Sequence, residues 1–237
     1  MSSNVRQTRS RVQRSAVFKN ARKFPAPINS SPSDLFTYPN PIGVAGLYYR
    51  RGDHRTMLIF VAGSCVYQTD FYGNIFIRAG CAWIFRPPPH PDHGRINGIH
   101  LEQEGPWHEE HPVTSHRAEL RAAIGALQCG RWYNLGMKNI VIASCSDYLV
   151  LGITEKIEVW REQGWRDTSG TVIANLDLWK ALLCEIDHYS DFDTKVYFWK
   201  IGDNDNTEAH AAARSAAILL PDIKQYSGVV PTYRSGD

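Results

Sequence analysis

The densest group of side chains able to bind a metal ion lies in a proline-rich segment between residues 87 and 111. Its candidate ligands are His90, His93, His100, His108, His111, Asp92, Glu109 and Glu110. Imidazole and carboxylate suit several divalent metals, but their spacing here matches no standard metal-binding motif. The prolines favour an exposed insertion, so we expect a solvated loop and no metal site in this segment.

The cysteines indicate the redox environment. The chain has five of them: Cys65, Cys81, Cys129, Cys145 and Cys184. The count is odd, no C-x-x-C spacing occurs, and several of these cysteines sit inside apolar runs. We therefore expect reduced thiols in an intracellular protein and no disulfide framework.

A series of short motifs between residues 57 and 217 points to one family. The motifs are AGSC at 62–65, GNIFIRAG at 73–80, HRAEL at 116–120, CSDYLV at 145–150, GW at 164–165, NLDLW at 175–179 and DNTEAH at 205–210. In this order and spacing the series resembles the type 1 ribonuclease H family. The resemblance implies an α/β fold over residues 57–220, a mixed five-stranded sheet with helices on both faces.

The resemblance also implies a metal-dependent reaction. Such enzymes cut the RNA strand of RNA–DNA hybrids with two Mg²⁺ or Mn²⁺ ions, held by four carboxylates from separate elements. The four matching positions of this chain hold Ala62, Glu119, Cys145 and His210, so only Glu119 is retained as a carboxylate. Thiol and imidazole are poor Mg²⁺ ligands, and the loop 200–205 lacks the histidine that the family carries there.

Three aspartates are candidate replacements for the lost carboxylates. Asp147 follows Cys145 by two residues, a step that moves a side chain by roughly 6–7 Å if the strand continues. Asp203 and Asp205 lie near the start of the last predicted helix, where Asn206 or Asp205 makes a natural N-cap. Together with Glu119 they form the candidate metal set, although we interpret them as ordinary loop and helix-start residues.

A zinc site is a second alternative. The resemblance implies that Glu119, Cys145 and His210 converge, and these ligand types with one water suit tetrahedral Zn²⁺. The simpler interpretation makes Cys145 a small buried side chain and His210 a polar group at a helix start. We favour the simpler interpretation, and expect no resident cofactor.

The resemblance further implies a surface for nucleic acid, namely an RNA–DNA hybrid or duplex recognised by its A-like shape. The candidate contacts lie beside the catalytic positions or just after the GW motif: Gly63, Ser64, Cys65, Ser146 and Arg166. Trp179, in contrast, is expected to pack in the core on an amphipathic helix.

The elements that position these groups follow from hydrophobic periodicity. We expect strands at 57–67, 75–85, 94–102, 138–143 and 195–200, and helices at 115–129, 147–160, 172–188 and 206–219. The first three strands can form antiparallel hairpins, whereas a helical crossover between the last two requires parallel neighbours. Residues 221–237 should form an extended and loosely held tail.

Charge is divided unevenly along the chain. Residues 1–33 carry seven cations and no acid, which leaves 19 basic and 24 acidic residues, a balance of −5, for the rest. Residues 1–56 are rich in cations, proline and serine, and we expect a largely disordered extension. It could be a nucleic-acid arm, a nuclear or mitochondrial address, or a plain solvated tail in a nuclear, cytoplasmic or mitochondrial protein. No apolar run of eighteen residues occurs, so no membrane partner is expected.

Two functions remain after this comparison of motifs. The preferred one is a catalytically impaired pseudonuclease that binds nucleic acid or, given its negative body, serves as a scaffold for a protein partner. The alternative is an active ribonuclease H that cleaves RNA in RNA–DNA hybrids through a rearranged divalent-metal site.

Overall fold

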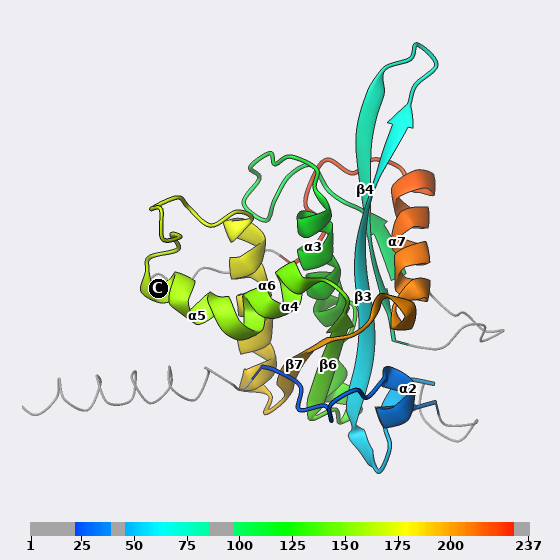
Figure 1. Cartoon of the computed structure of the whole chain (residues 1–237), viewed down its shortest axis with the longest axis vertical. Coiled ribbons are helices and arrows are strands. Elements are labelled where there is room, and N and C mark those ends of the chain that lie inside the picture. The colour runs from blue at the N-terminus through cyan, green and yellow to red at the C-terminus, as the bar shows by residue number, and fades with distance from the viewer. Residues whose placement is uncertain (1–21, 39–45, 86–96, 230–237) are drawn as a thin grey trace, which may run out of the picture.

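A mixed sheet forms the centre of the computed structural model, which describes residues 22–38, 46–85 and 97–229 (Figure 1). Its strands are β1 (Phe36–Thr37), β2 (Tyr48–Arg50), β3 (Asp53–Thr69), β4 (Ile75–Ile84), β5 (Asn97–His100), β6 (Asn139–Ser144) and β7 (Lys195–Lys200). β3, β4 and β5 pair antiparallel, whereas β6 lies parallel to β3 and β7 parallel to β6. The predicted mixed α/β sheet is confirmed, with seven strands in place of five.

The two additional strands come from the segment that we expected to be disordered. β1 pairs with β2, and β2 pairs with the start of β3. Phe24 donates its backbone N–H to the carbonyl of Phe198 and packs with Phe36 and Trp199 in a buried aromatic cluster. The prediction of disorder over residues 1–56 is therefore wrong for its described part, and residues 1–21 lie outside the described residues.

Helices cover both faces of the sheet, as predicted (Figure 1). They are α2 (Pro32–Leu35), α3 (Ser115–Gln128), α4 (Asp147–Leu151), α5 (Ile157–Glu162), α6 (Leu176–Asp191) and α7 (Thr207–Leu219). α3 and α6 lie on one face and α7 on the other. The helix predicted over 147–160 contains a π-helical segment, Gly152–Lys156, and the helix predicted to start at 172 starts at Leu176.

The alternation of side chains along β3 explains how one strand serves both layers. Met57, Ile59 and Val61 belong to the core beneath α3 and α6. Ala62 belongs to the cluster beneath α7, together with Ala213. Burial on both faces makes the strand an almost continuous apolar run. No helix in the described residues has the length and apolar character needed to cross a bilayer.

The C-terminal segment is attached to the domain along residues 221–229. Gln103 donates its backbone N–H to the carbonyl of Ile223. The side chain of Tyr226 is buried, and Ser227 donates to the buried carboxylate of Glu102. The prediction of a loosely held tail is therefore wrong as far as Val229, beyond which the structure is not described.

Candidate functional site

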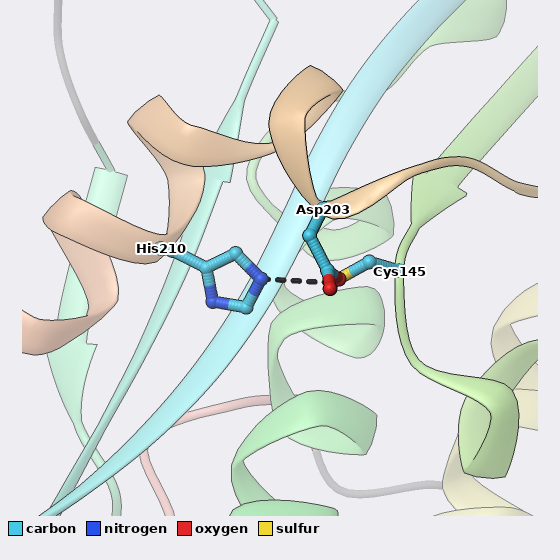
Figure 2. Close-up of side chains that lie close together, drawn as sticks. All are labelled: Cys145, Asp203 and His210. Atoms are coloured by element: carbon cyan, nitrogen blue, oxygen red, sulfur yellow. Dashed lines mark hydrogen bonds between the residues drawn. The ribbon is translucent and has the colours of Figure 1, made fainter.

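Two of the substituted positions face each other at the end of the parallel strands. Cys145 follows the last residue of β6, and His210 lies in the first turn of α7. The Cys145 Sγ atom is 2.7 Å from His210 Nε2 (Figure 2). Asp203, in the short 3₁₀ turn Asp203–Asp205, completes a group whose ligand atoms all lie within 4.8 Å of one another. This group is named the Cys–Asp–His cluster below.

Glu119 is hydrogen-bonded to a residue outside the Cys–Asp–His cluster. It lies on α3 and accepts a hydrogen bond of 2.5 Å from Ser146 Oγ. The same Ser146 oxygen accepts from the Leu149 N–H as the N-cap of α4. Burial raises the pKa of the Glu119 carboxyl, although the Ser146 hydrogen bond opposes the shift. The sequence placed Glu119 with Cys145 and His210; the structure has Asp203 in its place.

Ala62, the fourth position that the resemblance matched, offers no ligand atom. Ala62 is 2% exposed and packs against Ala82, Ala209 and Ala213. Next to it, Gly63 is required by helix packing, because a Cβ at this position would overlap the backbone of Ala118 and Glu119. Gly63 thereby brings α3, and with it Glu119, close against β3.

The three candidate replacement aspartates lie in different places in the structure. Only Asp203 joins the cluster. Asp147 is exposed and lies 3.4 Å from Lys200 Nζ, in an ion pair on the surface. Asp205 lines a separate cavity together with Phe60. Asp203 was expected to be an ordinary loop residue, but one of its carboxylate oxygens lies within 4.8 Å of the Cys145 thiol and the His210 imidazole.

The predicted nucleic-acid contacts are only partly brought together. Ser146 contacts Glu119, and the charge of Glu119 acts on the half-buried Cys65. Ser64 is half-buried and pairs with Gly80 in the sheet. Arg166 lies instead in the loop between α5 and α6, where it donates to the carbonyl of Gly170 at 2.7 Å. That loop is on the side of the molecule away from β4 and α7 (Figure 1).

The histidine-rich segment is divided among separate partners. His90 and His93 lie outside the described residues. His100 is buried and contacts the Leu101 carbonyl, His108 lies 3.5 Å from Glu104, and His111 lies 3.3 Å from Asp177. The carboxylate of Asp177 in turn accepts hydrogen bonds from Nη1 and Nη2 of the buried Arg117. These contacts are ion pairs and hydrogen bonds of the domain itself.

Two residues near the site were not predicted. Lys200 Nζ donates to the Cys145 carbonyl at 2.7 Å. Its positive charge acts to lower the pKa of Glu119 against the larger effect of burial, and His116 is a second electrostatic neighbour of that carboxyl. Lys200 could have been found, because it ends β7 beside Ser144 of β6 and parallel neighbours end at the same sheet edge. His116 stacks on Tyr148, a contact between distant residues that periodicity does not reveal.

The comparison with known proteins agrees with this architecture. The sequence model of the RNase H family matches residues 54–218. The chain belongs to the RNase H family. The ribonuclease H of Blochmanniella pennsylvanica is 30% identical over 167 residues, which cover 69% of this chain and 93% of that relative. The ribonuclease H of Blochmanniella floridana is 34% identical over 110 residues, 45% of this chain, and the match spans 62% of that relative.

Solved structures related to the RNase H family resemble the chain at lower identity. A foamy viral protease-reverse transcriptase in complex with RNA/DNA hybrid has 16% identity and a TM-score of 0.47, covering 69% of this chain and 20% of that one. LC9-RNase H1, a type 1 RNase H with the type 2 active-site motif, has 23% identity and a TM-score of 0.41, covering 70% and 74%.

The metal ions typical of RNase H do not fit the residues present here. Mg²⁺ takes oxygen ligands in near-octahedral geometry. Among the described residues, the Cys–Asp–His cluster is the group whose ligand atoms lie within mutual reach of one ion, and two of its three ligands are sulfur and nitrogen. Ala62 contributes nothing, and Glu119 is bound to Ser146. The donor set therefore argues against a pair of Mg²⁺ ions.

Proposed function

We propose that this RNase H family member binds RNA–DNA hybrid or duplex and has lost efficient two-metal cleavage. The observation that carries the proposal is the replacement of three of four catalytic carboxylates by Ala62, Cys145 and His210. Asp203 adds one carboxylate near two of these positions. A working pair of hard cations would thus have two carboxylates, Glu119 and Asp203, where the family has four.

The electrostatic consequence is large. Two dications about 4 Å apart repel each other by on the order of 16 kcal/mol at an effective dielectric constant of about 20, which is four times the value for unit charges. Four carboxylates balance the four positive charges of such a pair, whereas Glu119 and Asp203 balance half of them. The ammonium group of Lys200 adds a positive charge beside the site and opposes metal binding further. The pair should therefore not assemble at physiological Mg²⁺ concentration.

The same substitutions favour binding without cleavage. A phosphate backbone approaching this surface meets fewer negative charges than in a four-carboxylate site. Lys200 lies at the edge of the site and His116 beside Glu119. The five cations of residues 1–21 add an electrostatic contribution that carries no sequence information.

The proposal is tested by equilibrium binding of a fluorescent RNA–DNA hybrid at increasing salt. We expect the logarithm of the affinity to fall linearly with the logarithm of salt concentration, and deletion of residues 1–21 to weaken binding. This deletion leaves Arg22 and Lys23 in place, since they lie 3.5 and 3.8 Å from Glu158 and Glu155 and belong to the folded part. A full-length protein with no measurable affinity for hybrid or duplex at low salt would favour a protein partner and refute the proposal.

A further inference from the structure

Three side chains from three different elements converge where the family would place carboxylates. Cys145 comes from the end of β6, Asp203 from the 3₁₀ turn after β7, and His210 from the start of α7. Figure 2 shows the three side chains directed toward a common point. We propose that the Cys–Asp–His cluster binds a single Zn²⁺ ion through Cys145 Sγ, a carboxylate oxygen of Asp203 and His210 Nε2.

The ligand types select the metal. Thiolate, imidazole and carboxylate are the three protein ligand types of Zn²⁺, with bonds of about 2.0–2.3 Å, and a site with three protein ligands leaves the fourth tetrahedral position for water. The thiolate disfavours Mg²⁺ and Ca²⁺, which take oxygen ligands. Glu119 is not needed as a ligand, and its hydrogen bond with Ser146 can persist.

The distances require only a small adjustment. In a tetrahedral zinc site, sulfur and nitrogen ligands lie roughly 3.6 Å apart, as follows from the bond lengths. Cys145 Sγ and His210 Nε2 are 2.7 Å apart, in a direct hydrogen bond. The ion would replace the proton between them and separate the two atoms by roughly 1 Å. Asp203 is exposed on a short turn, so its side chain can change rotamer to bring a carboxylate oxygen to the ion.

The charges also balance for one ion. The Cys145 thiol releases its proton to solvent on binding, and thiolate and Asp203 carboxylate together neutralise one Zn²⁺. A pair of Mg²⁺ ions at the same place would keep a large excess of positive charge. The negative charges of the cluster therefore balance one Zn²⁺ ion but not two Mg²⁺ ions.

Outer contacts support the thiolate and hold its backbone. Asn206 is 1% exposed, donates to the Val61 carbonyl at 3.0 Å and lies with Nδ2 3.8 Å from Cys145 Sγ. Lys200 Nζ donates to the Cys145 carbonyl at 2.7 Å. Fixed donors around a ligand are what orient metal-binding side chains in established sites. Cys145 and His210 are half-buried and Asp203 is exposed, which leaves the ion a path from solvent.

The site is tested with the full-length protein, first stripped with a chelator and then titrated with Co²⁺, which reports thiolate coordination by a charge-transfer absorbance band. We expect one equivalent of Co²⁺ to give this band, and one equivalent of Zn²⁺ to abolish it by displacement. Cys145→Ser should remove the band. His210→Ala and Asp203→Asn should weaken affinity by about 100-fold or more, since losing even a hydrogen-bond partner of a ligand costs 10–100-fold.

Matched variants keep the result unambiguous. Cys129→Ser removes an exposed thiol elsewhere and should bind both metals as the parent does. Asp203→Asn changes an exposed side chain, so it tests the site without endangering the fold. The site is refuted if the folded parent binds no stoichiometric Zn²⁺, or if Cys145→Ser and Asp203→Asn bind it as tightly as the parent. This readout does not involve nucleic acid, so a protein that binds hybrid but no zinc would overturn the site alone.

Discussion

At position 145 a thiol stands where the RNase H motif has a carboxylate, while its neighbour keeps the structural part of that motif. Ser146 still caps α4 and still contacts Glu119. Ala62 is likewise accommodated in a close-packed alanine cluster. The proposed loss of cleavage therefore concerns Ala62, Cys145 and His210, whereas Ser146 keeps a role in the fold as the N-cap of α4.

The buried pair of Glu102 and Arg121 gives a prediction for stability. Both side chains are at most 4% exposed, and Arg121 donates to both carboxylate oxygens. Glu102→Gln leaves the buried Arg121 charge without its carboxylate, and we expect a loss of about 3–5 kcal/mol in the free energy of unfolding at pH 7. Urea denaturation measures it, with the exposed Glu109→Gln as the control, which should change stability by less than about 0.5 kcal/mol.

The same pair predicts how stability depends on pH. Burial opposes ionisation of Glu102, but the charge and hydrogen bonds of Arg121, with a hydrogen bond from Ser227, outweigh it and lower the pKa. A carboxyl whose pKa is lowered in the folded state contributes stability above its unfolded value, about 4.3, and loses it as pH falls through the folded value. The difference between parent and Glu102→Gln should shrink below about pH 4. A constant difference down to pH 2 would contradict this assignment.

The helices and strands with at least six residues of clear apolar pattern were predictable from the sequence, whereas the two- and three-residue strands were not. The limits of β7 match the prediction, and those of α3 and α7 differ by one residue. β1 and β2 have two and three residues, too few for an alternating pattern to be visible. The π-helical segment after α4 also has no periodic signature, because it changes hydrogen bonding without changing composition.

The site could be predicted in part for the same reason. The motif positions of Glu119, Cys145 and His210 follow from the family resemblance, and Cys145 and His210 do meet. The choice of Asp203 over Asp147 as the third member depends on which way two loops turn. Asp147 enters the first turn of α4 and lies beside Lys200, whereas the 3₁₀ turn places the exposed Asp203 beside Cys145 and His210. Sequence spacing does not determine either direction.

Contact between β3 and α3 gives a prediction for the elements that carry Glu119. Gly63→Ala places a Cβ against the backbone of Glu119, so α3 must move or the strand must bend. We expect a loss of about 1–3 kcal/mol or more in unfolding free energy, measured by thermal or urea denaturation. Gly202→Ala is the matched control, because its Cβ would lie 3.6 Å from the nearest atom, Asp205 Oδ2. Equal stability of the two variants would show that the helix does not depend on this close approach.

For the whole molecule, the domain extends beyond the limits that the family motifs define. Residues 22–38 add a strand and an aromatic cluster at one end of the sheet. Residues 221–229 cover the buried pair of Glu102 and Arg121 at another place, where Arg121 also lies over the ring of Tyr226. β3 and β4 extend beyond the helices as a hairpin whose tip exposes Phe71 and Tyr72 (Figure 1).

Truncation tests whether the C-terminal segment belongs to the domain. Ending the chain at Leu220 removes Tyr226 from the core and Ser227 from Glu102. We expect a loss of about 3–6 kcal/mol in the free energy of unfolding, the sum of about 1.5–3 kcal/mol for a buried aromatic side chain and about 1.5–3 kcal/mol for a hydrogen bond to a buried charge. A chain ending at Val229 keeps Tyr226, Ser227 and the hydrogen bonds between Gln128 and Val229, so it should be more stable than the chain ending at Leu220. Identical urea midpoints for the two truncations would contradict this account.

The most direct test of the central claim is cleavage of an RNA–DNA hybrid by the full-length protein at high concentration with Mg²⁺ or Mn²⁺. We expect no product above that of a Glu119→Gln preparation. We expect metal-dependent cleavage by the triple variant Ala62→Asp, Cys145→Asp, His210→Asp, once circular dichroism shows this variant to be folded. Cleavage by the parent that disappears in Glu119→Gln would contradict it, since two carboxylates would then suffice for the metal pair.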